Sequence, residues 1–362
     1  MLVIDGSYGE GGGQILRTAL ALAAIAGKAV RFEKIRAGRK NPGLAAQHLT
    51  VVRAIATLCN AQVSGDEPGS QTLIFRPGGP VQAGDYVFDV AEAREGGSAG
   101  AATLVLQAIL LPLSLAGLQR SQGQKRDSTV TIRGGTHVAW SPPFDYVQDV
   151  WLPALSRLGV DATLELNRWG WYPVGQGEIQ ATIRGLQSNL SPLTLVERGA
   201  LLRVRGRAVA ANLPSHIPQR MATRAQSLLK SAGIEARVDP LRVRAACAGA
   251  GIFLTAEYET VRAGFSALGA RGKASEVVAE EAVAALLAHR DSGAVLDQHL
   301  ADQLVLPLAL AGGVSSFSVE RVSRHLTTNI WVVEQFGLAR ASVAGNRVEL
   351  RSGGGGSPGE TR

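Results

Sequence analysis

Apolar and polar residues follow two different periods along this chain, and the two periods succeed one another in a repeated order. Three alanine- and leucine-rich segments are apolar on every face, which is typical of buried helices. They span residues 14–26, 102–116 and 303–311. The second and third share Leu-Val-Leu and then Leu-Pro-Leu-X-Leu-Ala-Gly. The pattern predicts three buried helices, each closed by a C-terminal glycine.

The same elements follow each of these helices in the same order. A short strand-like run comes first, at 30–35, 129–132 and 316–319. An amphipathic helix comes next, at about 44–58, 145–158 and 328–336. Two more strands close each unit, the last of them at 72–75, 179–183 and 347–350. We therefore predict an α/β (α+β) fold with three tandem β-α-β-α-β-β repeats, at about 1–80, 81–185 and 293–353.

Residues 186–292 do not fit this repeat. They contain strand candidates at 201–207 and 251–258, a helix after Pro214-Ser215 and another helix near 274–288. We predict a smaller inserted α+β domain here, so that 1–185 and 293–353 together form one large core domain. The glycine-rich segment 354–362 is expected to be a flexible tail.

Composition narrows the class of protein. Of the 362 residues, 46% are hydrophobic and 19% are charged, which supports a sizeable core and excludes wholesale disorder. The net charge of +7 is compatible with a polyanionic partner such as nucleic acid. Cys59 and Cys247 form no CxxC pair, so neither a zinc knuckle nor a disulfide framework is indicated.

The longest apolar stretch, 103–117, is interrupted by Gln107 and Pro112 and is too short to span a bilayer. The N-terminal residues show no signal-peptide pattern. We expect a cytoplasmic protein with no membrane partner. The sequence leaves the oligomeric state open.

A glycine-rich loop precedes the first helix. Gly6-Ser7-Tyr8-Gly9-Glu10-Gly11-Gly12-Gly13-Gln14 follows a strand directly, so its backbone N–H groups could cradle a phosphate. No Gly-Lys-Ser/Thr follows, and Gln14 stands where the dinucleotide fingerprint has its third glycine. A plain glycine turn is the alternative. Glu10 favours the phosphate interpretation, because a carboxylate in such a loop is tolerable only beside a divalent cation.

Equivalent helix starts in the other two repeats are also polar. Residues 94–103 form a second glycine-rich loop, and residues 297–303 read Asp-Gln-His-Leu-Ala-Asp-Gln. The three helix starts carry different polar residues. They therefore suggest one shared site to which each repeat contributes. Close packing of helix ends against a sheet would also select glycine, and that alternative explains the second loop well.

Two arginines are candidate phosphate ligands. Arg17 interrupts an otherwise apolar helix beside the glycine loop, and Arg39 lies in a glycine- and proline-containing loop at 36–43. The planar guanidinium suits phosphate recognition. For Arg39, a solvated basic loop is the alternative.

The six histidines differ in their surroundings. His289, at the end of an amphipathic helix, is expected at the surface, and His216 near a helix start, while His137 and His48 stay open. His325 stands at a strand-to-helix turn, where Thr327 or Thr328 can cap the helix. A histidine beside a helix N-terminus faces a natural phosphate site, and neutral imidazole is a competent nucleophile toward phosphorus.

These motifs together resemble the RNA 3′-terminal phosphate cyclase family. The resemblance rests on residues 9–17, 35–44, 299–304 and 325–330, and it spans nearly the whole chain in order. It implies an ATP-dependent reaction in which a histidine takes AMP from ATP. The AMP then passes to an RNA 3′-phosphate, and the neighbouring 2′-hydroxyl displaces it to leave a 2′,3′-cyclic phosphate.

The resemblance also implies roles for individual residues. His325 matches the adenylated nucleophile and Glu10 a ligand of Mg²⁺ or Mn²⁺, while Arg17 and Arg39 match phosphate-binding arginines. The residues that match the nucleotide site are Gln107, Pro142, Tyr146, His299, Asp302 and Gln303.

Two positions and one interval depart from the family pattern. His299 replaces a tyrosine that often stacks on adenine, Gln176 replaces a glycine, and the interval from Gln303 to His325 is one residue longer. Two other interpretations stay open at this point. One is a non-catalytic cyclase-like scaffold in RNA processing, which lacks the histidine, and the other is an enolpyruvyl transferase, which shares the repeat architecture.

Overall fold

The structure is a computed structural model, and it describes residues 1–93, 98–119 and 126–353. Residues 94–97 of the second predicted glycine loop and the predicted tail at 354–362 lie outside the described residues.

Each repeat builds one four-stranded mixed sheet with the same topology. The first repeat comprises β1 (Leu2–Asp5), α1 (Gly13–Ala26), β2 (Val30–Glu33), α2 (Ala46–Cys59), β3 (Gln62–Ser64) and β4 (Leu73–Arg76). Its strand order is β1-β2-β4-β3, in which β1 and β2 are parallel and the other pairs are antiparallel. The predicted α+β class is confirmed.

The second repeat has the matching order β5-β6-β8-β7, again with one parallel pair. It comprises β5 (Asp85–Asp89), η1 (Val90–Ala93), α3 (Ala102–Gln119), β6 (Ser128–Gly134), α4 (Phe144–Tyr146), η2 (Val147–Trp151), α5 (Leu152–Ser156), β7 (Ala162–Arg168) and β8 (Gly177–Ile183). The helix predicted over 145–158 is therefore a continuous helical stretch with a π-helical middle turn.

The third sheet includes a strand that lies before the inserted segment in the chain. Its elements are β9 (Thr194–Leu195), α8 (Leu300–Leu310), β14 (Gly313–Ser318), α9 (Arg324–Gln335), β15 (Ala339–Ala344) and β16 (Arg347–Ser352). The two-residue strand β9 pairs in parallel with β14, so the order β15-β16-β14-β9 reproduces the other two sheets. Because β9 completes the third sheet, we propose that the inserted domain begins after it and not at residue 186.

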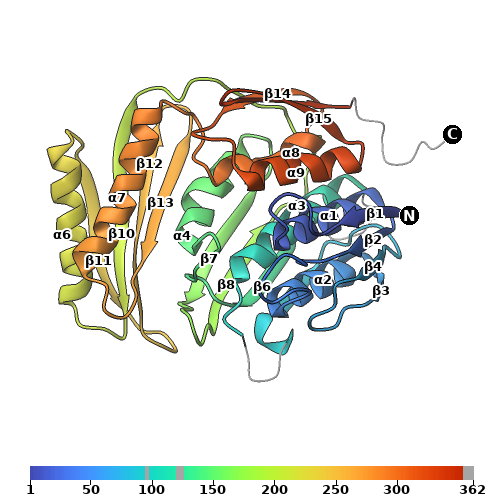
Figure 1. Cartoon of the computed structure of the whole chain (residues 1–362), viewed down its shortest axis with the longest axis horizontal. Helices are drawn as coiled ribbons and strands as arrows, with labels where there is room; N and C mark the ends of the chain where they lie inside the picture. Colours follow the sequence, from blue (N-terminus) through green and yellow to red (C-terminus); the bar gives the residue numbers. More distant parts are fainter. Residues whose placement is uncertain (94–97, 120–125, 354–362) are drawn as a thin grey trace.

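The insert forms the fourth sheet, with the order β11-β10-β12-β13. It comprises β10 (Leu201–Ala211), α6 (His216–Ser231), β11 (Ala236–Val243), β12 (Gly249–Tyr258), β13 (Arg262–Leu268) and α7 (Ser275–Ser292). In Figure 1 this unit lies to the left of the three repeats, and its strand β13 contacts η2 of the second repeat.

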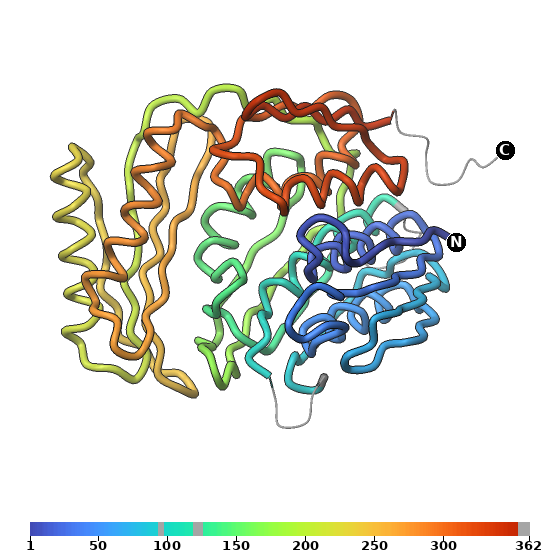
Figure 2. The backbone as a smooth tube through the Cα atoms, viewed as in Figure 1, coloured from blue at the N-terminus to red at the C-terminus, as the bar shows by residue number. Residues whose placement is uncertain are grey.

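The helices of the three repeats gather in the middle of the core, with the sheets around them (Figures 1 and 2). Helix α1 contacts α2, α3 and α9, and α8 contacts α9. Residues 19–23 of α1 are completely buried, which accounts for an apolar pattern on every face. This packing brings the start of α1 in the first repeat against the starts of α8 and α9 in the third.

Two helix ends differ from the sequence predictions. Gly117 lies inside α3 instead of closing it, and a Cβ atom there would meet the backbone of Gly185 at 2.6 Å, so this glycine permits close packing. Helix α9 begins at Arg324, four residues before the predicted start. Its N-cap is Ser323, whose hydroxyl accepts a hydrogen bond from the N–H of Leu326 at 3.1 Å, and neither Thr327 nor Thr328 caps it. No helix in the described ranges is long and apolar enough to cross a membrane.

Candidate active site

Three helices begin at one place, where the first and third repeats meet. Gln14 is in the first turn of α1, Asp302 in the first turn of α8 and His325 in the first turn of α9. The Nε2 group of Gln14 donates to a carboxylate oxygen of Asp302 at 2.7 Å, and its Oε1 contacts Nδ1 of His325. Gln14 therefore links the three helix starts.

The ring of His325 is held in one orientation. Because Nε2 of Gln14 donates to Asp302, its Oε1 must accept, and Nδ1 of His325 must carry the ring proton. The other nitrogen, Nε2, then has a free lone pair. The side chain is exposed to solvent, and within the described part of the chain Nε2 has no hydrogen-bond partner.

The electrostatic surroundings keep this imidazole neutral. Partial desolvation lowers the pKa of His325 below its usual 6.5, and the positive charges of Arg17 and Arg39 act in the same direction. A neutral ring with an open nitrogen, next to helix N-termini that attract anions, has the properties of a nucleophile toward phosphate.

Asp302, which is buried, and Arg17, which is half-buried, lie near this ring at the start of the helices. Burial raises the pKa of Asp302 to about 7, although Gln14 and Arg17 oppose the shift. Burial lowers the pKa of Arg17 to about 10, so Arg17 stays charged at neutral pH. Asn329 of α9 connects this helix to both α8 and α1. Its Nδ2 donates to the carbonyl of Asp302 at 2.7 Å, and its Oδ1 accepts from the hydroxyl of Thr18 at 2.8 Å.

The glycine-rich loop lies between β1 and α1 and is fixed to α9. The N–H of Glu10 donates to the hydroxyl of Thr328 at 3.0 Å, and the ring of Tyr8 stacks on Trp331 with centroids 4.1 Å apart. Gly9 has a φ of 56°, and a Cβ atom there would collide with the Thr328 hydroxyl, so this position requires glycine.

Glu10 and Arg39 face each other across this loop. Nη2 of Arg39 donates to the carbonyl of Glu10 at 3.0 Å and also contacts the Glu10 carboxylate. The second carboxylate oxygen of Glu10, Oε2, is buried and makes no hydrogen bond to any residue that the structure describes. Arg39 is therefore placed at the glycine loop, within the field felt by His325.

The predicted nucleotide residues lie on α3, α8 and the loop before α4. Nε2 of Gln107 donates to Oε1 of Gln303 at 2.7 Å, and the carbonyl of Pro142 accepts from the hydroxyl of Thr103 at 2.8 Å. All four residues are thus joined to α3 or α8.

Tyr146 and His299 lie next to this group. Their rings meet edge to face, with centroids 6.4 Å apart. The Tyr146 hydroxyl donates to Asp297 at 2.8 Å, and burial, reinforced by the charge of Asp297, raises the pKa of this phenol. The Tyr146 side chain is therefore buried with its hydroxyl already hydrogen-bonded, whereas the His299 side chain is exposed.

His48, left open by the sequence, belongs to this site. It is buried, and its Nδ1 accepts from the N–H of Ala45 at 3.1 Å, so Nε2 carries the proton. A Cβ atom on Gly13 would collide with that Nε2 group. Burial lowers the pKa of His48 to about 3, and the charges of Arg17 and Arg36 contribute. His48 is thus a neutral N–H donor at the start of α1.

The remaining histidines lie elsewhere. His137 is buried beside Asp145, and His216 is exposed at the first position of α6. The prediction that His289 lies at the surface is wrong. Its ring is fully buried, its Nδ1 contacts Glu320 at 2.6 Å, and it packs between Tyr258 and Phe265, because α7 is covered by the third repeat at this end.

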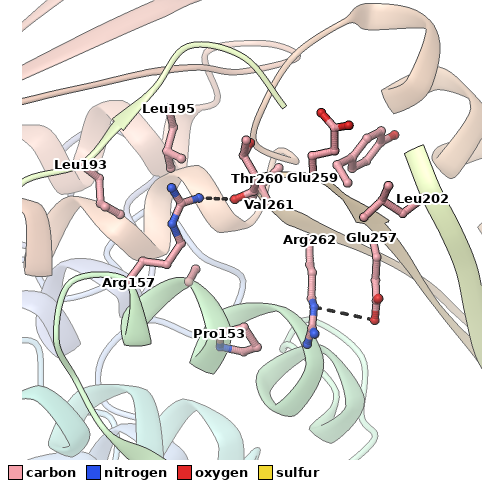
Figure 3. Close-up of a pocket in the computed structure, with 12 residues that line it drawn as sticks. Pro153, Arg157, Leu193, Leu195, Leu202, Glu257, Glu259, Thr260, Val261 and Arg262 are labelled. Atoms are coloured by element: carbon pink, nitrogen blue, oxygen red, sulfur yellow. Dashed lines mark hydrogen bonds and ion pairs between the residues drawn. The ribbon is translucent and has the colours of Figure 1, made fainter. Parts of the chain in front are cut away.

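A cavity of about 310 Å³ lies away from these residues, between the insert, α5 and β9 (Figure 3). Its walls combine leucines and Val261 with Arg157, Glu257 and Arg262. None of the candidate site residues lines it, so the cavity is separate from the junction of α1, α8 and α9.

Several site residues could not be found by sequence reasoning. In the sequence, Gln14 stands out only as a replacement for a glycine. Thr328 and Asn329 act through Glu10 and Thr18, which lie 318 and 311 positions away. Asp297 had a local signal, because an aspartate just before a helix is a common cap. Its carboxylate accepts from the N–H groups of His299 and Leu300, both at 2.9 Å.

Comparison with known proteins identifies the family. Residues 8–343 match the model of the family described as RNA 3′-terminal phosphate cyclase. The RNA 3′-terminal phosphate cyclase of Methylococcus capsulatus is 62% identical over 343 residues, which cover 95% of this chain and 93% of that protein. The protein of the same name from Gloeothece citriformis is 54% identical over 340 residues, covering 94% and 95%.

Among solved structures, the enolpyruvyl transferase NikO from Streptomyces tendae covers 94% of this chain and 80% of its own, with 12% identity and a TM-score of 0.25, and we draw no conclusion from it. The chain belongs to the RNA 3′-terminal phosphate cyclase family. The resemblance inferred from the sequence motifs is thereby confirmed.

Proposed function

We propose that this protein carries out the reaction of its family: ATP-dependent conversion of an RNA 3′-terminal phosphate to a 2′,3′-cyclic phosphate, with release of AMP and pyrophosphate. The observation that carries the proposal is the placement of His325. Of the six histidines, it is the one whose ring is oriented by a buried side chain, Gln14, while its second nitrogen stays open beside two arginines.

His325 would act through Nε2. This nitrogen attacks the α-phosphorus of ATP, and the N–P bond forms as the bond from that phosphorus to pyrophosphate breaks, with its electron pair leaving on pyrophosphate. Nδ1 keeps its proton, and the contact with Gln14 stabilises the positive charge that the ring gains. A covalent intermediate of this kind divides one difficult displacement into easier steps.

Transfer to RNA reverses the role of the ring. A 3′-phosphate oxygen of RNA attacks the AMP phosphorus, and the N–P electron pair returns to Nε2. The RNA 2′-hydroxyl then attacks the 3′-phosphorus, loses its proton and displaces AMP. Arg17 and Arg39, from α1 and the loop after β2, are proposed to hold the phosphates during these steps, because guanidinium groups bind phosphate oxygens in a fixed geometry.

The glycine loop fits a divalent cation, Mg²⁺ or Mn²⁺, through Glu10. Its buried Oε2 lacks a partner among the described residues, and Mg²⁺ is commonly held by one carboxylate together with substrate phosphates. A bound cation would neutralise charge on the phosphate oxygens. Arg39 holds the other side of the Glu10 carboxylate and keeps it in place.

The proposed nucleotide pocket uses α3, α8 and the loop before α4. Gln107 and Gln303 form one edge and Pro142 another, with Tyr146 as the inner wall. Asp302 positions Gln14 by accepting the hydrogen bond from its Nε2 group. His299 replaces a larger aromatic ring at the exposed edge, and its imidazole would stack on adenine.

RNA with a 3′-terminal phosphate is the proposed partner, and the net charge of +7 favours a polyanionic substrate. A cytoplasmic location is proposed from Cys59 and Cys247, both of which are free thiols, as is usual in reducing compartments.

A cyclisation assay tests the function. The protein is incubated with ATP, Mg²⁺ or Mn²⁺ and an oligoribonucleotide labelled at its 5′ end and carrying a 3′-phosphate. We expect the 3′-phosphate to become resistant to phosphatase only when ATP is present, with one AMP formed for each cyclic end. An oligonucleotide ending in a 3′-hydroxyl is the control. ATP-independent resistance, or none with either metal, would reject the proposal and leave a scaffold role.

A further inference from the structure

Two large aromatic side chains stand in solvent on loops of the second repeat. Trp140 is 99% exposed and Tyr172 is 75% exposed, and no other ring packs against either of them in the described ranges. Trp140 also has a φ of 65°, a left-handed conformation that is uncommon for a bulky residue. An exposed indole held in an unfavourable backbone conformation indicates a functional constraint.

The two loops are held side by side by a rigid layer of rings. His137, three residues before Trp140, bridges Trp171, which directly precedes Tyr172. The His137 ring is buried and stacks on both Trp169 and Trp171, with centroid distances of 4.5 and 5.1 Å. Buried, packed side chains thus hold the loops that carry the two exposed rings. This reduces the entropic cost of ordering these loops when a ligand binds.

A chain of contacts joins this base to the candidate active site. Pro142, two residues after Trp140, is hydrogen-bonded to Thr103 on α3. Gln107, one helical turn further along α3, is hydrogen-bonded to Gln303, which is next to Asp302 in α8. Asp302 is hydrogen-bonded in turn to Gln14, the residue that orients His325. Trp140 therefore lies on the loop that forms one edge of the proposed nucleotide pocket.

Two exposed arginines lie next to residues of the ring layer that carries the two loops. Arg168 is exposed just before Trp169, although it pairs with Glu178 at 3.1 Å. Arg244 is exposed next to Ala245, which bridges Trp169, and it forms no ion pair with any described residue. Exposed aromatic rings beside positive charges are the combination by which proteins bind single-stranded nucleic acid, because bases stack on the rings and the charges follow the backbone.

We propose that Trp140 and Tyr172 form a stacking platform for the bases of the RNA strand that lie upstream of the 3′-terminal phosphate. This inference rests on the proposed function, because it assumes that the 3′ end lies at His325. The platform sets affinity for longer RNA and takes no part in the chemistry of the terminal phosphate.

Binding and turnover measured separately test this proposal. Binding is followed by fluorescence anisotropy with a dye-labelled RNA decamer ending in a 3′-hydroxyl, which cannot react. Trp140→Ala and Tyr172→Ala are each expected to raise its Kd roughly five- to hundredfold, the range for loss of one base–aromatic stack. Trp140→Phe keeps a ring and should stay within about threefold of the wild type. Val87→Ala, at an exposed position of β5 in the same repeat, is the matched control.

Turnover distinguishes the platform from the nucleotide pocket. With 3′-phosphorylated substrates, the alanine variants should raise KM for the decamer but not for a dinucleotide, and the KM for ATP in forming the enzyme–AMP adduct should not change. An unchanged decamer Kd in both alanine variants would overturn the platform, as would a raised KM for ATP with unchanged RNA binding. Ring-dependent RNA binding without any cyclisation would instead overturn the proposed function and leave the platform supported.

Discussion

His325 and His137 are both histidines with lowered pKa values, and both lie where two parts of the chain meet, yet their surroundings differ in the way that matters for chemistry. His137 uses both ring nitrogens, with Nδ1 2.7 Å from the Thr136 hydroxyl and Nε2 2.8 Å from Asp145. His325 uses only Nδ1, and its side chain reaches solvent.

The two regions also differ in a carboxylate, which is Asp145 beside His137 and Glu10 in the glycine-rich loop. Asp145 lies between His137 and Arg207, whose Nε is 2.9 Å away, and joins the second repeat to the insert. Glu10 is held by Arg39 on one side and keeps one buried oxygen without a partner in the described part of the chain. A perturbed pKa therefore does not distinguish a reactive group from a structural one here. An unpaired ring nitrogen does so only where it also reaches solvent, as in His325, because the buried Nε2 of His289 has no hydrogen-bond partner in the described ranges either.

Removing each histidine in turn should separate the reactive role of His325 from the structural role of His137. His325→Ala should lower the cyclisation rate by about 10⁴-fold or more, because the nucleophile is lost, and should leave the melting temperature nearly unchanged. His216→Ala, at an exposed position of α6, is the matched control and should keep full activity.

His137→Ala should show the opposite result. Removing it leaves a cavity against the Trp169 and Trp171 rings and takes one partner from the buried Asp145 carboxylate, so the free energy of unfolding should fall by about 3–5 kcal/mol in urea titrations. Activity per folded molecule should change far less than in His325→Ala. Equal losses of activity in the two variants would remove the distinction drawn between them.

Glu10→Ala should slow formation of the enzyme–AMP adduct by about 100-fold at limiting metal, with partial recovery as Mg²⁺ or Mn²⁺ is raised. The reason is that its open oxygen is the proposed ligand. Glu10→Gln keeps the shape and should also lose metal affinity. A metal dependence identical to the wild type in both variants would show that Glu10 only shapes the loop.

Arg39→Ala should harm one half-reaction more than the other if Arg39 holds the RNA phosphate. Loss of a guanidinium–phosphate contact costs about 2–3 kcal/mol, so AMP transfer to RNA should slow roughly 30- to 100-fold while adduct formation changes less. Single-turnover measurement of each step separates the two. Equal losses would place Arg39 at the phosphates of the nucleotide, which its contact with Glu10 also permits.

The last expected effect concerns Asp302, and it is an effect on stability. Because burial raises its folded-state pKa from 3.8 to about 7, its contribution to stability is complete below about pH 4 and is lost as pH rises through about 7. Asp302→Asn has no such titration. Its stability relative to the wild type should therefore rise by about 3 kcal/mol between pH 5 and pH 9, measured by urea unfolding. Parallel pH profiles would contradict the assignment.

The sequence predicted the repeated elements well because buried helices carry a strong local pattern, as in α1, α3 and α8. It missed β9, since two residues leave no periodicity and the strand is defined only by pairing with β14. Likewise, Gln176 replaces a glycine at a φ of 53°, which shows why glycine is usual at that position, although its role in the site was not predicted.

The site was predicted as a set of residues but not as a network. Glu10, Arg17, Asp302 and His325 each lie in a recognisable motif, and the structure brings them together. The orientation of His325 depends on Gln14, 311 positions away in the sequence, and no local pattern reports such a contact. His289 was misjudged for the same reason, because its burial depends on Glu320 and the third repeat.

The most direct test of the central claim is to locate the covalent adduct. The protein is incubated with metal and ATP labelled at the α-phosphate, digested under alkaline conditions that preserve N–P bonds, and mapped by mass spectrometry. We expect one AMP on the peptide that contains His325, attached at Nε2, acid-labile and discharged by RNA with a 3′-phosphate but not by RNA with a 3′-hydroxyl. AMP found on any other residue, or no adduct under conditions that support cyclisation, would contradict the account.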